Sequence, residues 1–523
     1  MPEALVRMKT YVQPFESVLA LREVAALTGS RARPIDPTSG TYGVPAAKRL
    51  LLADRAAYWE RVDGLVTRQV LREATVAHAR RQTGRLLEAP PMTLFHEDVA
   101  IPTRRVLRYG PHGIHEYRGK FFPQLVRALL NLSGVKPGSL VVDPMIGSGT
   151  TAVEALLAGH SSLGLDMNPL SVYLSRTKCA LLSEDPGNLI QEFCDVRDGL
   201  AGLTDAEQGT YLGSLSERSR AYLEAWFPES NLRALDLIAT TIGARPAGPT
   251  RDLMWLSLSN ILRRVSLQKT ADLRVRRDSA DSMDPVAAFL KELHRSVGLV
   301  ASLRYLESGS PTGRVGIREG DARDLTSHLD RVGERADVII TSPPYATALP
   351  YLDTDRLSLL FLGLLDRADL RARDGEMIGN REISLRQRRE LWEDFERGRE
   401  GLPAPIVHLI ERIRALNEAT DSGFRRRNLP PLLSKYFLDM TRVIEACHDV
   451  LRPRASLFLV VGDNRTRAAG KWVDIPTSSL LSDIAQVHGF ELEDSIDMEM
   501  LVARDIHRHN ALPAEKVLVL KRR

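Results

Sequence analysis

The sequence of 523 residues predicts an α/β fold with a mostly parallel sheet. Short apolar runs at residues 139–143, 161–166 and 337–341 each end in an acidic or polar residue, and a helical pattern follows the first of them. Such runs are typical of strands that are buried between two layers of helices. A further run at 456–461 indicates another strand, and a last one at 516–520 indicates the final strand of a closing hairpin.

The composition is that of a globular protein without a membrane segment. Hydrophobic residues make up 43% and charged residues 26% of the chain, and no apolar run approaches the length of a membrane span. Residues 1–15 lack the basic-then-apolar layout of a signal peptide, so we expect a cytoplasmic protein with no membrane partner. The formal net charge of +4 is compatible with a nucleic-acid partner but does not require one.

The cysteines and histidines do not suggest a metal site. Cys179, Cys194 and Cys447 lack Cys-x-x-Cys spacing, which argues against a disulfide framework or a zinc site. His112 and His115 have no carboxylate or cysteine partner at ligand spacing. We therefore expect structural roles for these side chains and no bound metal.

A glycine-rich turn follows the predicted strand at residues 139–143. Gly147 and Gly149 allow the backbone to turn tightly under a ligand, and the helix that follows offers free N–H groups at its N-terminus. The turn is not the dinucleotide fingerprint, because Ala152 stands at the position of its third glycine. The next strand ends at Asp166, where an acidic side chain is placed to accept both hydroxyls of a ribose.

Residues 337–345 have the sequence Asp-Val-Ile-Ile-Thr-Ser-Pro-Pro-Tyr, a buried strand that ends at a rigid turn. Pro343 and Pro344 fix φ and lack N–H donors, so the carbonyls of Ser342 and Pro343 are held as free acceptors. Acceptors aimed at the N–H bonds of an exocyclic amine favour its pyramidal, nucleophilic form and stabilise the positive charge that develops on nitrogen. Tyr345 offers a surface on which a flipped base can stack. An ordinary strand-terminating turn is the alternative interpretation.

Two motifs carry a resemblance to a known family. Ser342-Pro343-Pro344-Tyr345 resembles the catalytic motif of the amino-group DNA methyltransferases, which is Ser-Pro-Pro-Tyr in most cytosine-N4 enzymes and Asp-Pro-Pro-Tyr or Asn-Pro-Pro-Tyr in most adenine-N6 enzymes. Residues 143–151 are similar to their Asp-Pro-Phe-x-Gly-Ser-Gly-Thr-Thr cofactor loop, with Met145 where Phe is usual. The resemblance implies a Rossmann-like S-adenosylmethionine-dependent methyltransferase fold, with a mostly parallel seven-stranded sheet and an antiparallel edge hairpin.

The resemblance also implies which residues hold S-adenosylmethionine. Residues 112–123 resemble the segment that precedes the cofactor loop, although Arg118-Gly119 stand where a Pro-Ala pair is common, and Asp321 matches the residue that binds the adenine amine. The cofactor-binding residues expected on this basis are Tyr117, Lys120, Phe121, Asp143, Met145, Gly147, Ser148, Gly149, Thr150, Asp166, Asp321 and Ala322.

The matching segments define an expected domain organisation. The methyltransferase core is divided into three segments, and helical periodicity and charge mark the regions between them. The expected regions are a helical N-terminal accessory region (1–110), a first core segment with the cofactor loop (111–182), a mainly helical insertion (183–312), a second core segment with the adenine-binding residues and the catalytic turn (313–345), a charged helical insertion (346–433) and a third core segment (434–523). The family usually places target recognition next to the catalytic turn, whereas the larger insertion here precedes it.

Both insertions are candidates for contact with double-stranded DNA. The first is a candidate for target recognition and the second for DNA contact, because each carries a basic cluster. The candidate nucleic-acid residues are Arg263, Arg264, Arg425, Arg426 and Arg427. A solvated surface is the alternative interpretation of each cluster.

The expected function is that of a site-specific DNA methyltransferase involved in DNA methylation and restriction-modification. It would transfer a methyl group from S-adenosylmethionine to the exocyclic amine of a flipped base, with cytosine N4 favoured by Ser342. The alternatives are an adenine-N6 DNA methyltransferase, an RNA base-amine methyltransferase and a non-catalytic nucleic-acid-binding protein. A restriction or phage-defence partner is compatible with the resemblance.

Overall fold

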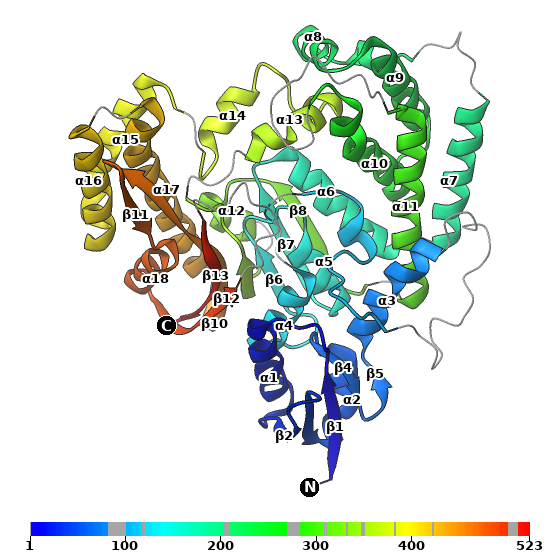
Figure 1. Ribbon diagram of the computed structural model, residues 1–523, viewed down its shortest axis with the longest axis vertical. Coiled ribbons are helices and arrows are strands. Elements are labelled where there is room, and N and C mark those ends of the chain that lie inside the picture. The colour runs from blue at the N-terminus through cyan, green and yellow to red at the C-terminus, as the bar shows by residue number, and fades with distance from the viewer. Residues whose placement is uncertain are drawn as a thin grey trace.

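The computed structural model describes residues 2–81, 101–117, 119, 122–202, 209–268, 283–307, 309, 311–330, 333–346, 351–380, 383–420, 423–499 and 511–523. Figure 1 shows a central sheet with the helices of residues 385–450 on one side and those of residues 186–306 on the other. The N-terminal residues lie at one end of the molecule. No helix in the described ranges is long and apolar enough to cross a membrane.

The central sheet has the strand order β12-β13-β10-β9-β6-β7-β8, and β11 pairs with β10 off this path. Neighbouring strands from β10 to β8 are parallel, whereas β13 is antiparallel to both β10 and β12. The bounds are β6 Leu140–Asp143, β7 Ser161–Asp166, β8 Val315–Glu319, β9 Ala336–Thr341, β10 Leu451–Ala468, β11 Lys471–Ile475, β12 Phe490–Glu499 and β13 Ala511–Arg522. The predicted sheet and its edge hairpin are confirmed, and β11 is an addition that the sequence pattern did not predict.

The strand order reverses between β6 and β9. From β6 the chain continues to β7 and β8 on one side, and from β9 it continues to β10 on the other. Val141 pairs with Val338 and Val142 with Ile339, so the two strands are direct neighbours. In open α/β sheets the crevice outside the carboxyl ends of two such strands is the usual ligand site.

Helices cover both faces of the sheet, because successive side chains of each strand point to opposite faces and both sets are apolar here. On β9, Ile340 packs with α4 (Pro123–Ser133), whereas Ile339 packs with α17 (Phe424–Val450) and α18 (Thr477–Val487). The remaining core helices are α5 (Thr150–Leu157), α6 (Pro169–Ala180) and α12 (Leu325–Asp330). Strands buried on both faces explain why their sequences are continuous apolar runs.

The N-terminal region is mixed, so the prediction of a helical region over residues 1–110 is only partly correct. It contains an antiparallel sheet of order β2-β3-β1-β4-β5. Along β1, buried Ala4, Val6 and Met8 alternate with exposed residues, a period of two that so short a strand displays only weakly. The bounds are β1 Glu3–Met8, β2 Arg33–Asp36, β3 Thr41–Pro45, β4 Trp59–Val62, β5 Leu65–Val66, α1 Pro14–Thr28, α2 Arg49–Arg55 and α3 Arg68–Arg81.

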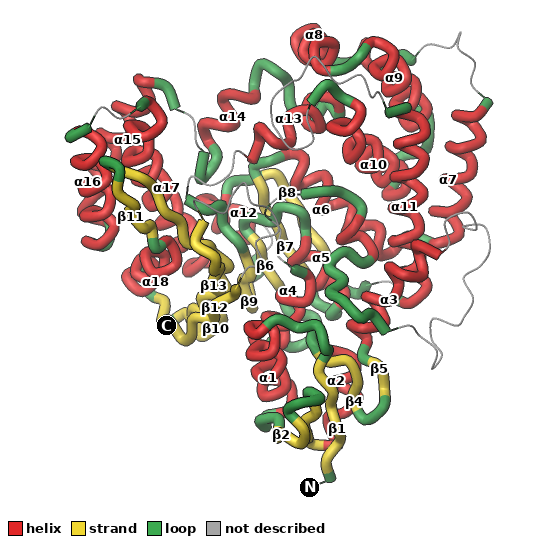
Figure 2. Tube along the Cα trace, in the orientation of Figure 1, coloured by secondary structure: helices red, strands yellow, loops and turns green. Residues whose placement is uncertain are grey.

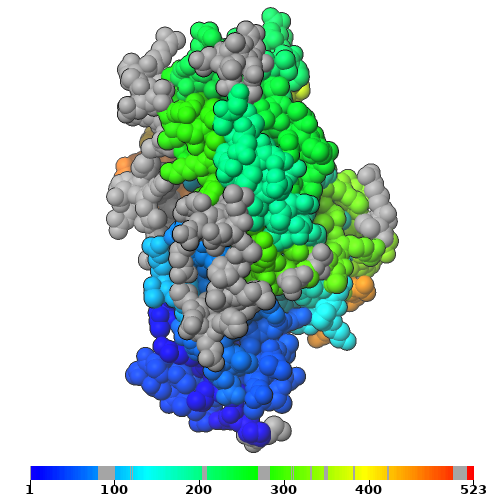
Figure 3. All heavy atoms as spheres, turned by 90° about the vertical axis from the view of Figure 1, so that its right-hand side faces the viewer, coloured from blue at the N-terminus to red at the C-terminus, as the bar shows by residue number. Residues whose placement is uncertain are grey.

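The first insertion is helical where it is described, as predicted, and the second insertion is divided between two bodies. Helix α13 (Tyr351–Phe361) contributes Leu357, Leu359 and Leu360 to the core of the first insertion, whereas α15 (Leu385–Gly398) and α16 (Ala404–Glu418) pack with α17. Figures 2 and 3 show the first insertion at the end of the molecule opposite the N-terminal sheet. The other helices are α7 Pro186–Ala201, α8 Glu217–Trp226, α9 Glu229–Gly243, α10 Pro249–Val265, α11 Pro285–Leu306 and α14 Leu370–Glu376.

The expected boundary at residue 433 falls inside α17, which begins at Phe424 although Pro430 and Pro431 lie within it. Pro430 has no N–H to donate to the carbonyl of Arg426 four residues earlier. The Asn417 Nδ2 atom donates to that oxygen at 2.9 Å and takes the place of the missing donor. A tertiary hydrogen bond therefore supports a helix that the local sequence argues against.

Candidate active site

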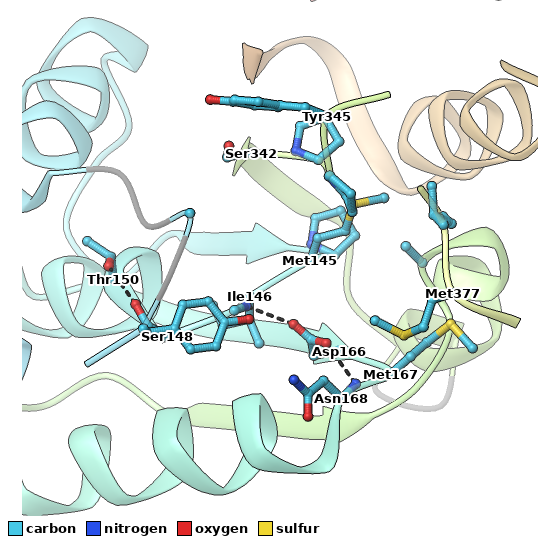
Figure 4. Close-up of a pocket in the computed structure, with 18 of the residues that line it drawn as sticks. Met145, Ile146, Ser148, Thr150, Asp166, Met167, Asn168, Ser342, Tyr345 and Met377 are labelled. Atoms are coloured by element: carbon cyan, nitrogen blue, oxygen red, sulfur yellow. Dashed lines mark hydrogen bonds between the residues drawn. The ribbon is translucent and has the colours of Figure 1, made fainter. Parts of the chain in front are cut away.

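A cavity of about 300 Å³ opens at the carboxyl ends of β6, β7 and β9, where the strand order reverses. Figure 4 shows Ser342 and Tyr345 on one side of it and Asp166 and Asn168 on the other, with Met145 between. The lining residues are Tyr117, Gly119, Phe122, Leu125, Pro144, Met145, Ile146, Gly147, Ser148, Thr150, Asp166, Met167, Asn168, Gly320, Asp321, Ala322, Ser342, Pro343, Pro344, Tyr345, Met377, Ile378, Met498 and Glu515. This volume and mixed lining suit a small organic ligand.

The loop after β6 is held from beneath by α6. The Ser175 hydroxyl donates to the Gly147 carbonyl at 2.9 Å, and the buried Lys178 ammonium donates to the Ser148 carbonyl at 2.8 Å. Gly149 has φ of +79°, and a Cβ there would lie 2.8 Å from the Ser175 Oγ atom. Glycine is thus required both by backbone conformation and by the close approach of α6.

Asp166 sits at the end of β7 with both carboxylate oxygens engaged. Oδ2 accepts from the Gly147 N–H at 2.9 Å, and Oδ1 accepts from the Asn168 N–H at 2.8 Å. The Ser171 hydroxyl and the Met167 N–H are further donors to this carboxylate, which lines the cavity. Burial raises the pKa of Asp166 to about 6, against the lowering effect of the hydrogen bonds from Asn168 and Gly147.

Asp143 lies behind the loop and does not line the cavity. Its Oδ1 accepts from the Met145 N–H at 3.1 Å, and its Oδ2 accepts from the Thr151 hydroxyl at 2.7 Å. Burial raises the pKa of Asp143 to about 6 despite these bonds. The carboxyl group therefore ties β6 to the start of α5 and shapes the loop from inside.

Asp321 lines the cavity at the end of β8, with Arg323 folded against it at 2.5 Å between Nη2 and Oδ2. Burial acts to raise the pKa of Asp321, but the hydrogen bonds and charge of Arg323 outweigh it and lower the pKa. Arg323 also donates to Asp439 of α17 at 2.7 Å and to the Glu376 carbonyl at 3.1 Å. Asp321 is therefore held as a carboxylate in a fixed position.

The second insertion closes one side of the cavity, which the sequence did not predict. Met377 and Ile378, directly after α14, line it. The Lys435 ammonium donates to the Met377 carbonyl at 3.1 Å, and Arg373 donates to the Met167 carbonyl at 3.0 Å. Two cations separated by 62 positions in the sequence thus hold this segment against the core.

The turn after β9 places Ser342, Pro343, Pro344 and Tyr345 in the cavity wall. The Tyr345 hydroxyl donates to Glu515 of β13, whose pKa is raised by burial against the lowering effect of this hydrogen bond. The ring lies over Gly462 of β10, where a Cβ would come within 2.9 Å of Tyr345 Cε2. Gly462 and Glu515 are cross-strand partners, so together they form a seat for the tyrosine.

Most of the predicted site residues lie together in this cavity. Asp143 and Gly149 lie behind the lining, and Lys120 and Phe121 lie outside the described residues. The sequence missed Asn168, Met377, Ile378 and Glu515. Asn168 could have been found from its place two residues after Asp166, but the other three depend on long-range packing.

The predicted basic residues lie on two separate elements. Arg263 and Arg264 are in the last turn of α10, where Arg264 lies 3.5 Å from Glu292, and Arg425, Arg426 and Arg427 are exposed in the first turn of α17. His112 contacts the buried Glu154 at 2.9 Å, and His115 contacts Ser259 at 2.9 Å. No metal-binding cluster occurs among the residues that the structure describes.

Comparisons with known proteins agree with this geometry. A family model described as UPF0020: RMKL-like, methyltransferase domain matches residues 115–180. Type II methyltransferase M.MvaI from Kocuria varians is 25% identical over 397 residues, which cover 71% of this chain and 80% of the relative. Type II methyltransferase M.BsoBI from Geobacillus stearothermophilus is 23% identical over 419 residues, covering 73% and 78%. A tRNA (guanine(10)-N2)-dimethyltransferase from Methanothermobacter thermautotrophicus is 42% identical over 52 residues, covering 10% and 16%.

The strand order and the cavity at its reversal define a Rossmann-like methyltransferase. Together with the two long matches and the Ser-Pro-Pro-Tyr turn, they support an amino-group methyltransferase. The methyl donor of this class is S-adenosylmethionine.

The lining residues fit that donor. Asp166 lines the cavity with a carboxyl group that could accept from a ribose diol, and Asp321 is a fixed carboxylate at the neighbouring strand end. Met145, Ile146, Met377 and Ile378 supply apolar surface for a purine, and the N-terminus of α5 favours a carboxylate. These groups would hold the nucleoside and amino-acid ends of the ligand.

We predict that Gly149→Ala weakens both the fold and cofactor binding more than Gly159→Ala does. Both glycines have a left-handed backbone conformation, with φ of +79° and +78°, so alanine costs roughly 1–2 kcal/mol of backbone strain at either position. Only at Gly149 does the added Cβ also meet Ser175, whereas nothing lies within 4 Å of it at Gly159. Urea denaturation and calorimetry with S-adenosylmethionine measure the two effects. Equal losses in both variants would show that Ser175 yields without moving the loop.

Proposed function

We propose that the chain methylates DNA at the exocyclic amine of a flipped base, with cytosine N4 as the target atom. The observation that carries this proposal is the placement of Ser342 through Tyr345 in the wall of the cavity that Gly147 and Asp166 also line. A target base and the methyl donor can therefore meet in one space. The long matches to Type II methyltransferases support DNA as the substrate.

The turn supplies acceptors at the point where charge develops. The Ser342 hydroxyl and the Pro343 carbonyl would accept hydrogen bonds from the amine, which frees its lone pair for attack. S-adenosylmethionine supplies an electrophilic methyl group. The amine nitrogen forms the new bond to carbon, the bond from carbon to sulfur breaks, and the proton leaves the cationic amine for water, directly or through Ser342.

Ser342 favours cytosine because adenine-N6 enzymes usually carry Asp or Asn at this position. Adenine N6 remains the competing target, since the same acceptors can bind its amine. A base amine in RNA is a further candidate, which the short match to a tRNA dimethyltransferase favours. A non-catalytic role is disfavoured because the turn and the loop keep their acceptors and glycines in place.

Mass spectrometry of nucleosides from methylated nucleic acid tests the proposal. The protein is incubated with labelled S-adenosylmethionine and either duplex DNA or total RNA. We expect N4-methylcytosine from DNA, and Ser342→Ala should lower turnover more than it lowers cofactor affinity. N6-methyladenine without N4-methylcytosine would overturn the base assignment alone, whereas labelled RNA with unlabelled DNA would overturn the substrate.

We predict that cofactor affinity falls as pH drops through about 6, because Asp166 then gains a proton and loses an acceptor position. The association constant should approach a tenfold loss per pH unit below that point, the limit for one proton. The stability of the unliganded protein should have the opposite dependence, since a pKa raised by folding makes the carboxylate destabilising at higher pH. Calorimetry and urea denaturation between pH 5 and about 8 measure both.

The control for this prediction is Asp355→Asn. Asp355 accepts from Asn168 at 2.9 Å and its pKa is also raised to about 6 by burial, but it does not line the cavity. That variant should keep the pH step in affinity, whereas Asp166→Asn should bind weakly without it. If the pH dependence of affinity disappeared in Asp355→Asn and persisted in Asp166→Asn, the titrating group would be Asp355 and the prediction would be wrong.

We predict that Glu515 acts on turnover through the Tyr345 hydroxyl. Glu515→Ala and Tyr345→Phe should each lower kcat by about tenfold, the value of one hydrogen bond to a charged group. Glu515→Gln should retain most activity, because its amide oxygen still accepts from the phenol. In the Tyr345→Phe background, Glu515→Ala should have almost no further effect. If Glu515→Ala still lowered kcat about tenfold in the Tyr345→Phe background, Glu515 would contact the target base itself.

A further inference from the structure

Strand β10 runs past the catalytic turn and leaves the central sheet. Beyond Gly462 it pairs with β11 in an antiparallel hairpin, with Arg465 opposite Asp474, Thr466 opposite Val473 and Arg467 opposite Trp472. Figure 1 shows this hairpin reaching toward α15 and α16. The hairpin continues strand β10, which contains Gly462, the residue under the Tyr345 ring.

The two faces of the hairpin differ in character. Ala468, Val473 and Ile475 are buried in the core that α16, α17 and α18 share. Arg467 and Trp472, which are paired across the strands, are exposed on the opposite face. The hairpin is therefore anchored by one face and presents the other away from those helices.

The exposed face holds two cations on one aromatic ring. The guanidinium carbons of Arg465 and Arg467 lie 4.5 and 4.7 Å from the centre of the Trp472 ring, which is itself 40% exposed. Within the described residues, no carboxylate lies within ion-pair distance of Arg467. Cation–π contact with Trp472 holds both guanidiniums in position, and it does not neutralise the charge of Arg467.

The hairpin starts beside the catalytic turn. The Asn464 Nδ2 atom donates to the Ala346 carbonyl at 3.0 Å, one residue after Tyr345. At about 3.3 Å per strand residue, Arg467 is displaced from that contact by roughly 10 Å. Arg467 is therefore close enough to the turn to contact the backbone of a duplex whose flipped base reaches Tyr345.

We propose that the exposed face of the β10–β11 hairpin binds the phosphate backbone of duplex DNA beside the flipped nucleotide. The inference rests on the proposed function, since it takes the same substrate. Arg465 and Arg467 supply fork-shaped donors for phosphate oxygens, and Trp472 keeps them in place before the DNA arrives. Asp474 lies opposite Arg465, so the positive charge of this face is strongest at Arg467, nearer the tip.

Salt dependence of DNA binding tests the surface. Replacing both Arg465 and Arg467 by Gln should reduce the slope of log affinity against log salt by about 1.8, from two lost phosphate contacts. Between about 50 and 200 mM salt, the affinity of the double variant should then change roughly tenfold less than that of the wild-type protein. The probe is a duplex oligonucleotide that the wild-type protein methylates.

Variants of Trp472 separate the effect of positioning the two guanidiniums from the effect of their charge. Trp472→Ala keeps both arginines but removes the ring that positions them, so DNA affinity should fall severalfold. Trp472→Phe keeps an aromatic ring and should retain most of the affinity. The matched control is Arg33→Gln, which removes an exposed arginine from β2 at the far end of the molecule. S-adenosylmethionine affinity should be unchanged in all of these variants, because none of the residues lines the cavity.

The outcomes distinguish this inference from the proposed function. A wild-type protein that methylates DNA, together with hairpin variants whose salt slope matches that of Arg33→Gln, would overturn the surface and leave the function standing. A wild-type protein that neither binds nor methylates DNA would overturn both. A slope that falls in the hairpin variants alone, with intact cofactor binding, supports the surface.

Discussion

The site depends on one constraint, the reversal of strand order between β6 and β9. Because these strands are parallel neighbours whose chains continue in opposite directions, their carboxyl ends leave a space that no crossover helix fills. The loop that begins at Pro144 and the turn that begins at Ser342 both enter it, although 198 positions separate them in the sequence. Topology alone therefore brings the glycine-rich loop and the Ser-Pro-Pro-Tyr turn together.

Buried carboxyl groups make that space rigid, and their surroundings divide their roles. Asp143 uses its oxygens on Met145 and Thr151, so it shapes the loop and has no access to a ligand. Asp166 accepts from the backbone N–H groups of Gly147 and Asn168 and lines the cavity. Asp321 is kept charged by Arg323, whereas burial pushes the other two toward the neutral form. Similar side chains at adjacent strand ends thus differ in pKa because their partners differ.

Local patterns were sufficient to predict the sheet and the residues at its strand ends. Buried parallel strands have continuous apolar sequences, and the acid at 166 and the turn at 342–345 follow such runs directly. The N-terminal sheet was missed because its strands are short, and β11 because its pattern alternates over only five residues. Helix α17 begins before two prolines because Asn417 replaces a lost donor, a contact that no local rule contains.

The position of Tyr345 shows why the sequence could not give the whole site. Its motif determines that an aromatic ring follows two prolines, but the orientation of that ring is set by Gly462 and Glu515 on two later strands. The antiparallel pairing of β10 with β13 brings those residues opposite one another. Strand β13 therefore supplies a contact for a turn that precedes it by about 170 positions in the sequence. The same strand β10 then continues into the hairpin that carries Arg465, Arg467 and Trp472. One strand therefore links the orientation of the Tyr345 ring to the surface proposed to bind the DNA backbone.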